Sequence, residues 1–471
     1  MINKKNRYIK FCLCLVLFCN CLLVSFILGP KEYLYDSRFY WTISDPVISG
    51  GSFNLMDFPE TFRGCLLPLL NCFIKQVIPG HYGWILLSAL MTSITFAFML
   101  PSLLGVTVDD LKAAVKIVAA QWCFFYFWAD FLQFPLSDLP AAFSLMLGIF
   151  MLNAFDKHKL RGIWRLLLGF TAGASFYFAY NTRAAYLYGV IFYGVYYCIK
   201  NRKIYKQIIV RFAVVVLGML IISIPQCMLN KQYVGKFSPK IYTEQYTGYG
   251  SSLQARQVFW GLEYQRYETY VGDPGYFPHP AVHFSDMTGL ELLYRENLNQ
   301  ENFKIKDFFV LFFKYPLDMI GIYTRHLVAL ITPAWKRIYI ENMYTNKFFL
   351  VIISIFIWFI AGINFIMESQ EKKLPTDKLF ILFSVMLPSF LQLLGMPELR
   401  FFVAVYLVLY AYVFLKIDYR RWLGFVKKNW KTILPVSVII IILWISVFGS
   451  ELADNSDAQM IIHDYQIESF K

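Results

Sequence analysis

The chain alternates between long apolar runs and short polar segments over its whole length. The runs are about 17 to 22 residues long, enough for a helix to cross the roughly 30 Å hydrocarbon layer of a membrane. Because a spanning segment must satisfy its own backbone polar groups, each run predicts a transmembrane helix. Eleven runs can be delimited: 11–28, 82–104, 113–128, 131–153, 163–179, 183–199, 208–229, 348–367, 378–395, 401–415 and 432–448.

Two further apolar stretches, 65–78 and 308–332, are interrupted by prolines and charged residues. Such a pattern is typical of helices that lie along a membrane surface or dip into it. We expect that position for both, while 308–332 could also span. The sequence therefore predicts an all-α polytopic membrane protein with about eleven transmembrane helices.

Clusters of basic residues set the expected orientation. Lys and Arg gather at the N-terminus and in 157–165, 200–211 and 416–431, which the positive-inside rule assigns to the cytoplasm. An odd number of spans satisfies all four clusters, so the C-terminus, including Gln459, is expected outside. The net charge of +13 is thus explained without nucleic acid as a partner. The first run lacks a small-residue cleavage site before Pro30, so we interpret it as a retained span.

Composition agrees with this class of protein. Hydrophobic residues make up 58% and aromatic residues 19% of the 471, and the mean hydropathy is +0.49, too apolar for a soluble globular protein of this size. The nine cysteines lie in or beside apolar runs, in no pattern that indicates a disulfide framework or a Cys-x-x-Cys metal site.

Three regions follow from the spacing of the runs. Residues 1–229 form an N-terminal transmembrane module with an outer loop at 30–80, residues 230–346 an extracytoplasmic domain with an interfacial helix, and residues 347–471 the C-terminal helices with an outer tail. The second region is far longer than an ordinary connection and is therefore expected to carry function. Its Tyr, Trp, Gly and Pro content favours a mixed domain of a few short helices rather than a sheet. The absence of related halves disfavours a transporter built from repeats.

The outer loop 30–80 carries three carboxylates among aromatic residues: Asp36, Asp45 and Asp57. Asp36 is the candidate catalytic residue, because a carboxylate at a partly dehydrated surface can accept the proton of a hydroxyl nucleophile. The alternative is that Asp36 caps a helix running through 37–49. Asp45 and Asp57 are expected to be solvated or capping residues.

Further polar residues gather at the predicted outer ends of the spans, where ionisable groups at membrane depth mark a function or an internal pair. Asp138 could contact substrate, pair with an arginine or cap the break at Pro140. Arg183 could grip a lipid phosphate or extend to the interface. Glu398 and Arg400 could pair with each other or hold a pyrophosphate. The whole set is Asp36, Asp130, Asp138, Asn181, Arg183, Glu398 and Arg400.

Two more candidates fall in the long outer region. Arg256 lies among aromatic residues, a mixture that suits sugars and phosphates, and His326 is either a packing residue or a base. No HExxH, P-loop or GxGxxG motif is present, so we expect no nucleotide or metal cofactor from motifs, while a requirement for a divalent cation stays open.

The retained first span is followed by an outer loop that opens with DSRFYWTIS and by an amphipathic RGCLLPLL helix. Together these segments resemble the GT-C superfamily of membrane glycosyltransferases. The strings FPLSDLPAAFSLMLGIF and YNTRAAYLYG resemble the branch that includes aminoarabinose transferases and protein mannosyltransferases. Many relatives carry two adjacent acidic residues in the first loop, whereas here Asp36 is followed by Ser37.

The resemblance implies transfer of a sugar from a polyprenyl-phosphate carrier to the hydroxyl of a lipid or glycan acceptor, at the outer face of a bacterial cytoplasmic membrane. Asp36 would be the general base, and Arg183 and Arg400 would hold the carrier phosphate. Arg256, His326, Asp138 and Glu398 would be further substrate contacts. Two other classes stay open: a surface-polysaccharide polymerase or ligase, and a flippase or transporter of lipid-linked glycans that uses Asp138 as its coupling site.

Overall fold

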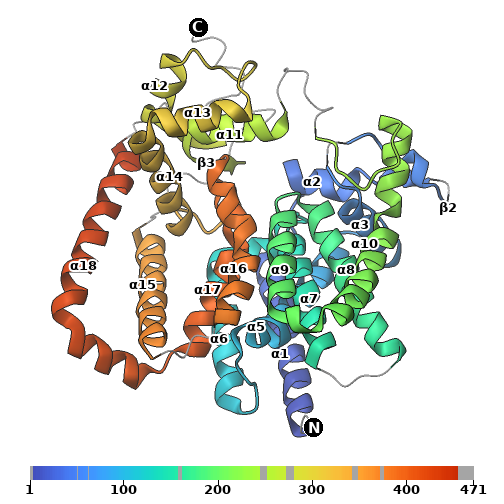
Figure 1. Ribbon diagram of the computed structural model, residues 1–471, viewed down its shortest axis with the longest axis horizontal. Helices are drawn as coiled ribbons and strands as arrows, with labels where there is room; N and C mark the ends of the chain where they lie inside the picture. Colours follow the sequence, from blue (N-terminus) through green and yellow to red (C-terminus); the bar gives the residue numbers. More distant parts are fainter. Residues whose placement is uncertain are drawn as a thin grey trace.

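The protein is a helical bundle with a smaller mixed region at one end (Figure 1). The computed structural model describes residues 4–49, 51–61, 63–157, 162–243, 252–271, 281–341, 348–371 and 376–453. Within these residues eight helices are long and apolar enough to cross a membrane. The protein is therefore polytopic and mostly helical, as the sequence predicts.

Each of the eleven predicted runs falls on a helix. The eight with the length and hydropathy of a span are α1 (Lys4–Leu28), α4 (Tyr82–Ile94) with η3 (Thr95–Met99) and α5 (Leu100–Leu104), α6 (Leu111–Trp128), α7 (Asp138–Lys157), α10 (Tyr205–Val234), α15 (Phe348–Gln370), α16 (Thr376–Leu391) and α17 (Val403–Lys416). The other three runs form α8 (Ile163–Thr182), α9 (Tyr186–Asn201) and the kinked α18 (Tyr419–Ala453).

One predicted boundary is wrong in a way that matters for the site. The fourth run was expected to start at residue 131, two turns before Asp138. Instead a 3-10 turn, η4 (Ala129–Leu132), follows α6, and α7 begins at Asp138 itself. Pro135 disfavours the α conformation at the residue before it, so the chain turns there rather than continuing as helix. Asp138 is thereby placed at a helix end.

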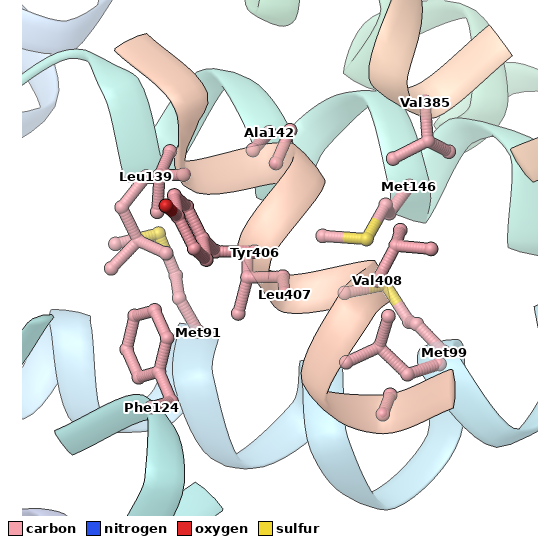
Figure 2. Close-up of a cluster of buried hydrophobic side chains, with 14 of the residues drawn as sticks. Met91, Met99, Phe124, Leu139, Ala142, Met146, Val385, Tyr406, Leu407 and Val408 are labelled. Atoms are coloured by element: carbon pink, nitrogen blue, oxygen red, sulfur yellow. The ribbon is translucent and has the colours of Figure 1, made fainter. Parts of the chain in front are cut away.

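Helix α17 forms the centre of the bundle. Its sequence is apolar on all sides, which is typical of a helix surrounded by others, and almost every side chain in it is buried. Figure 2 shows Tyr406, Leu407 and Val408 of α17 among side chains from four neighbouring elements: Met91 of α4, Phe124 of α6, Met146 of α7 and Val385 of α16. This packing fixes the start of α17, and with it the preceding residues 398–402.

Helices α8 and α10 approach each other through glycine. A Cβ atom added at Gly173 would lie 1.9 Å from the carbonyl oxygen of Val215, and one at Gly218 would lie 2.2 Å from that of Phe170. Small residues at such crossings let helix backbones touch, a common device in membranes.

A compact segment between α1 and α4 follows the first helix. It contains α2 (Tyr35–Thr42), η1 (Asp45–Val47), a hairpin of β1 (Ile48–Ser49) and β2 (Ser52–Phe53), η2 (Leu55–Asp57) and α3 (Leu66–Val77). The expected helix through 37–49 is shorter than predicted. Asp36 lies within the first turn of α2 and Leu34 occupies the cap position, so the capping alternative for Asp36 is wrong.

The region after α10 combines helices with a sheet. Its helices are α11 (Leu253–Glu263), α12 (Met287–Arg295), α13 (Ile305–Lys314) and α14 (Pro316–Ile331), and its strands are β3 (Tyr264–Tyr270), β4 (Ala281–Ser285) and β5 (Tyr339–Ile340). The expectation of helices without a sheet is therefore wrong. The strand order is β4-β3-β5, antiparallel then parallel, and aromatic and Thr residues in β3 favour the extended state.

The two ends of the bundle carry different segments, and we name them by one residue each. At the Asp36 end lie α2, α3, the sheet region and residues 395–402; at the Lys200 end lie the start of α1 and the connections between α9 and α10 and between α17 and α18 (Figure 1). The basic clusters that begin at residues 200 and 416 thus lie at the Lys200 end. Residues 244–251, 272–280 and 454–471, which include Gln459, lie outside the described residues.

Candidate active site

Asp36 is positioned by a contact between distant parts of the chain. The hydroxyl of Tyr339 in β5 accepts a hydrogen bond from the Ser37 N–H (3.1 Å) and donates one to the Leu34 carbonyl (3.0 Å). Tyr35, between them, has a φ of +45°, which a non-glycine residue adopts only at a cost of about 1 kcal/mol. The start of α2 is thus locked in a strained conformation by the sheet region, and strain of this kind is often found at functional sites.

Two arginines bracket the Asp36 carboxylate. Arg63 Nη2 lies 2.7 Å from Oδ1, and Arg400 Nη2 lies 2.6 Å from Oδ2. Burial alone would raise the pKa of Asp36, but the two guanidinium groups outweigh it and hold that pKa well below its usual range. About 28% of the Asp36 side chain remains exposed, so a ligand can reach it.

Arg400 has a second carboxylate. Its Nε lies 2.6 Å from Oε1 of Glu398, a side chain that is only 2% exposed. Burial raises the pKa of Glu398 to about 7, with Asp36 and Asp138 adding to the shift and Arg400 opposing it. The predicted pair of Glu398 and Arg400 is therefore present, and Arg400 extends it to Asp36.

A second ion pair joins this group from the α7 and α8 ends. Arg183 pairs with Asp138, and its guanidinium lies over the Phe401 ring, 3.8 Å from the centroid. The Arg400 guanidinium lies 5.3 Å from the same ring centroid. Asp138 thus takes the role of an arginine partner, and Oδ2 of this carboxylate has no hydrogen-bond partner among the described residues.

Behind this group lies a carboxylate that the sequence did not single out. Glu268 of β3 is buried, and burial raises its pKa to about 8. Glu398 adds to that shift, whereas Arg266, the Leu399 backbone N–H and Arg400 oppose it. The Tyr267 N–H donates a hydrogen bond to the Pro397 carbonyl (3.2 Å), which connects β3 to the segment that carries Glu398.

Sequence reasoning also missed Arg63, which belongs to the loop before α3. A Cβ added at the neighbouring Gly64 would lie 1.8 Å from the carbonyl oxygen of Asn181, so only glycine allows this approach to α8. Asn181 Oδ1 accepts from Leu66 N–H (2.8 Å), and its Nδ2 donates to Gln226 of α10 (2.9 Å). The sequence signal for Arg63 was its position next to a glycine, just before an amphipathic helix.

The structure leaves two predicted contacts outside the group. Arg256 lies in α11 with its guanidinium 5.5 Å from the Trp260 ring centroid. His326 of α14 is fully buried, with Nδ1 2.7 Å from the Leu393 carbonyl, and burial lowers its pKa. That geometry favours the packing alternative for His326. Asp130 is likewise a structural partner, because it pairs with Arg337 (2.8 Å) and accepts from the Ile338 N–H.

The site therefore consists of Asp36, Arg63, Asp138, Arg183, Glu268, Glu398 and Arg400, together with Phe401 and Tyr339. A narrow cleft next to the site is lined by Arg63, by Glu60 of the preceding loop and by Tyr233 of α10. Among the described residues no three His, Cys, Asp or Glu side chains are grouped so that they could hold a metal ion.

This arrangement defines a class: a polytopic helical membrane protein with a cluster of buried carboxylates and arginines at one end of its bundle. Comparisons of the chain with protein-family models, with curated proteins and with solved structures find no match.

Proposed function

We propose that the protein is an integral membrane glycosyltransferase of the GT-C type. It moves a sugar from a polyprenyl-phosphate carrier to an acceptor hydroxyl at the outer face of a bacterial cytoplasmic membrane. The observation that carries the proposal is Asp36, a partly exposed carboxylate between two arginines at the end of an apolar bundle. A lipid-borne phosphate presents its headgroup at the membrane surface, near the ends of spanning helices, and arginine is suited to bind it because its planar fork matches phosphate oxygens.

The reaction assigned to the site is a single displacement. The acceptor hydroxyl oxygen attacks C1 of the sugar, the bond from C1 to the phosphate oxygen breaks, and its electron pair stays on the phosphate. Asp36 takes the hydroxyl proton as general base. Arg63 and Arg400, with Arg183 nearby, stabilise the negative charge that grows on the leaving phosphate. Attack from the face opposite the phosphate inverts the configuration at C1.

The remaining charged residues keep the arginines in place. Glu398 orients Arg400, and Asp138 orients Arg183, each as a nearly buried partner. The proposed orientation puts the N-terminus in the cytoplasm and the Asp36 end outside, where cell-envelope glycans are assembled. Basic segments at the Lys200 end support it, because cytoplasmic loops carry an excess of Lys and Arg.

The test is a transfer assay with purified protein in nanodiscs and a panel of polyprenyl-phosphate sugars, with and without a chelator. Asp36→Asn should lower the rate by about 100-fold or more, the usual contribution of a general base. Asp45→Asn is the matched control, because Asp45 lies in the same segment but pairs with Lys75 at an exposed position. A wild-type rate for Asp36→Asn, at normal yield and folding, would reject the mechanism, and no transfer from any donor would reject the class.

A further inference from the structure

The Asp36 carboxylate occupies the position that a phosphate would need. Its two oxygens each face a different guanidinium, 2.7 Å from Arg63 and 2.6 Å from Arg400. Carboxylates and phosphates are held by arginine in the same way, through parallel bonds to two oxygens with similar spacing. An anionic headgroup that binds the Nη2 atom of either arginine must therefore displace Asp36 from that arginine.

Both arginines keep other anchors when Asp36 leaves. Arg400 is held through Nε by Glu398, while the nitrogen that faces Asp36 is Nη2. The Arg63 guanidinium lies over two aromatic rings of α2, 4.8 Å from the centroid of Phe39 and 5.1 Å from that of Tyr40. The guanidinium pair is therefore preorganised for an anion, and less ordering is needed on binding.

We propose that Asp36 is an internal substitute for the phosphate, so that an incoming phosphate and Asp36 compete for Arg63 and Arg400. This proposal rests on the proposed function in one respect: the phosphate is identified as that of a lipid carrier. When the phosphate binds, its charge compensates the two arginines and Asp36 is released. The released carboxylate faces solvent and an acceptor instead of two cations.

This exchange explains how one residue can be both ion-paired and basic. In the unliganded site the arginines hold the pKa of Asp36 so low that it is a poor proton acceptor. Removing their charge from its neighbourhood moves that pKa back up. The base is thus formed only when the donor is in place, which protects the site from activating water or an acceptor too early.

Competition predicts an effect on binding that is independent of catalysis. Purified full-length protein is titrated by calorimetry with farnesyl phosphate, with inorganic phosphate and with farnesol. We expect Asp36→Asn to bind farnesyl phosphate at least about tenfold more tightly than wild type, because the internal competitor is gone. Arg63→Gln should bind it about tenfold more weakly, Asp45→Asn should match wild type, and farnesol should not distinguish the four proteins.

Each result bears on the proposal separately from transfer activity. Unchanged or weaker binding by Asp36→Asn, or no binding of either phosphate by wild type, overturns it. Tightening for inorganic phosphate equal to that for farnesyl phosphate supports the competition but assigns the ligand to free phosphate rather than a lipid. Competition without any glycosyl transfer would leave this inference standing and reject the proposed function.

A wild-type measurement covers the case in which Asp36→Asn does not fold. Infrared difference spectra taken on adding saturating farnesyl phosphate should show the carboxylate stretching band of a residue that loses its arginine partners. Asp36→Glu should shift that band, because the longer side chain meets the arginines differently. A difference spectrum without any carboxylate change at saturation would contradict the displacement.

Discussion

The ion pairs at the two ends of the bundle use the same kinds of residues but differ in environment. At the Lys200 end, Lys200 pairs with Asp377 at 2.7 Å with both side chains about half exposed. At the Asp36 end, Glu398 is 2% exposed and shares Arg400 with Asp36. Exposed pairs contribute little, typically about 0 to 1 kcal/mol, whereas a buried charge that loses its partner costs several. The desolvation cost is therefore large for Glu398 and Arg400 and small for the Lys200–Asp377 pair.

The partners also differ in how many elements they connect. Lys416 at the end of α17 pairs with Glu368 of α15, a neighbouring helix. Arg400 lies just before α17 and pairs with Asp36, which is 364 residues earlier in the chain. A cluster assembled from distant segments under a desolvation cost is more typical of a functional site than of a structural latch. This difference gives three predictions.

The largest effect is expected from removing Arg400. Arg400→Ala leaves Glu398 and Asp36 without their shared cation, so the free energy of unfolding should fall by about 3 kcal/mol. Lys416→Ala, at the other end of α17, should cost less, because its carboxylate partner Glu368 is 15% exposed whereas Glu398, a partner of Arg400, is 2% exposed. Denaturant unfolding in detergent micelles measures both. Equal losses for the two variants would erase the contrast between the ends.

The second prediction concerns pH. The pKa of Glu398 is raised from its usual 4.5 to about 7 in the folded protein. The folded state therefore holds this proton at pH values where the unfolded state has lost it. The raised pKa of Glu398 therefore contributes to the free energy of unfolding fully below pH 4.5, and this contribution is lost as the pH rises through 7.

Glu398→Gln should remove this part of the pH dependence. Between pH 5 and 7.5 the unfolding temperature of wild type should fall by about 2 °C more than that of the variant. Glu291→Gln, an exposed residue paired with Arg295, should keep the wild-type slope. Thermal unfolding followed by intrinsic fluorescence is sufficient, and identical slopes for wild type and Glu398→Gln would show that Glu398 ionises normally.

The smallest effect is expected at the Lys200 end. A double-mutant cycle of Lys200→Ala and Asp377→Asn should give a coupling energy of about 0.3 kcal/mol, which disappears in 0.5 M salt. The cycle compares the unfolding free energies of the two single variants and the double variant. A coupling above about 1.5 kcal/mol that persists in salt would place this pair in the same class as the Asp36 cluster.

Local pattern was enough to predict the helices and their division into two ends. Apolar runs of spanning length and clusters of Lys and Arg each depend on nearby residues, and each of the eleven runs falls on a helix. Asp36, Asp138, Arg183, Glu398 and Arg400 were also expected at one end, and the structure brings all five together. Periodicity alone did not predict the three-stranded sheet. Strand β3 pairs with β4 and β5, which lie further along the chain and are separated from it by other segments.

The pairings within the cluster were decided by the tertiary structure alone. Sequence gives the residue types and their side of the bundle, but not that Arg63 and Arg400 share Asp36, or that Tyr339 holds the start of α2. These contacts depend on how α17, α8 and the sheet pack against one another. Because the charge state of a buried carboxylate is set by its neighbours, packing also decided that two arginines hold the pKa of Asp36 low while burial raises the pKa of Glu398 to about 7.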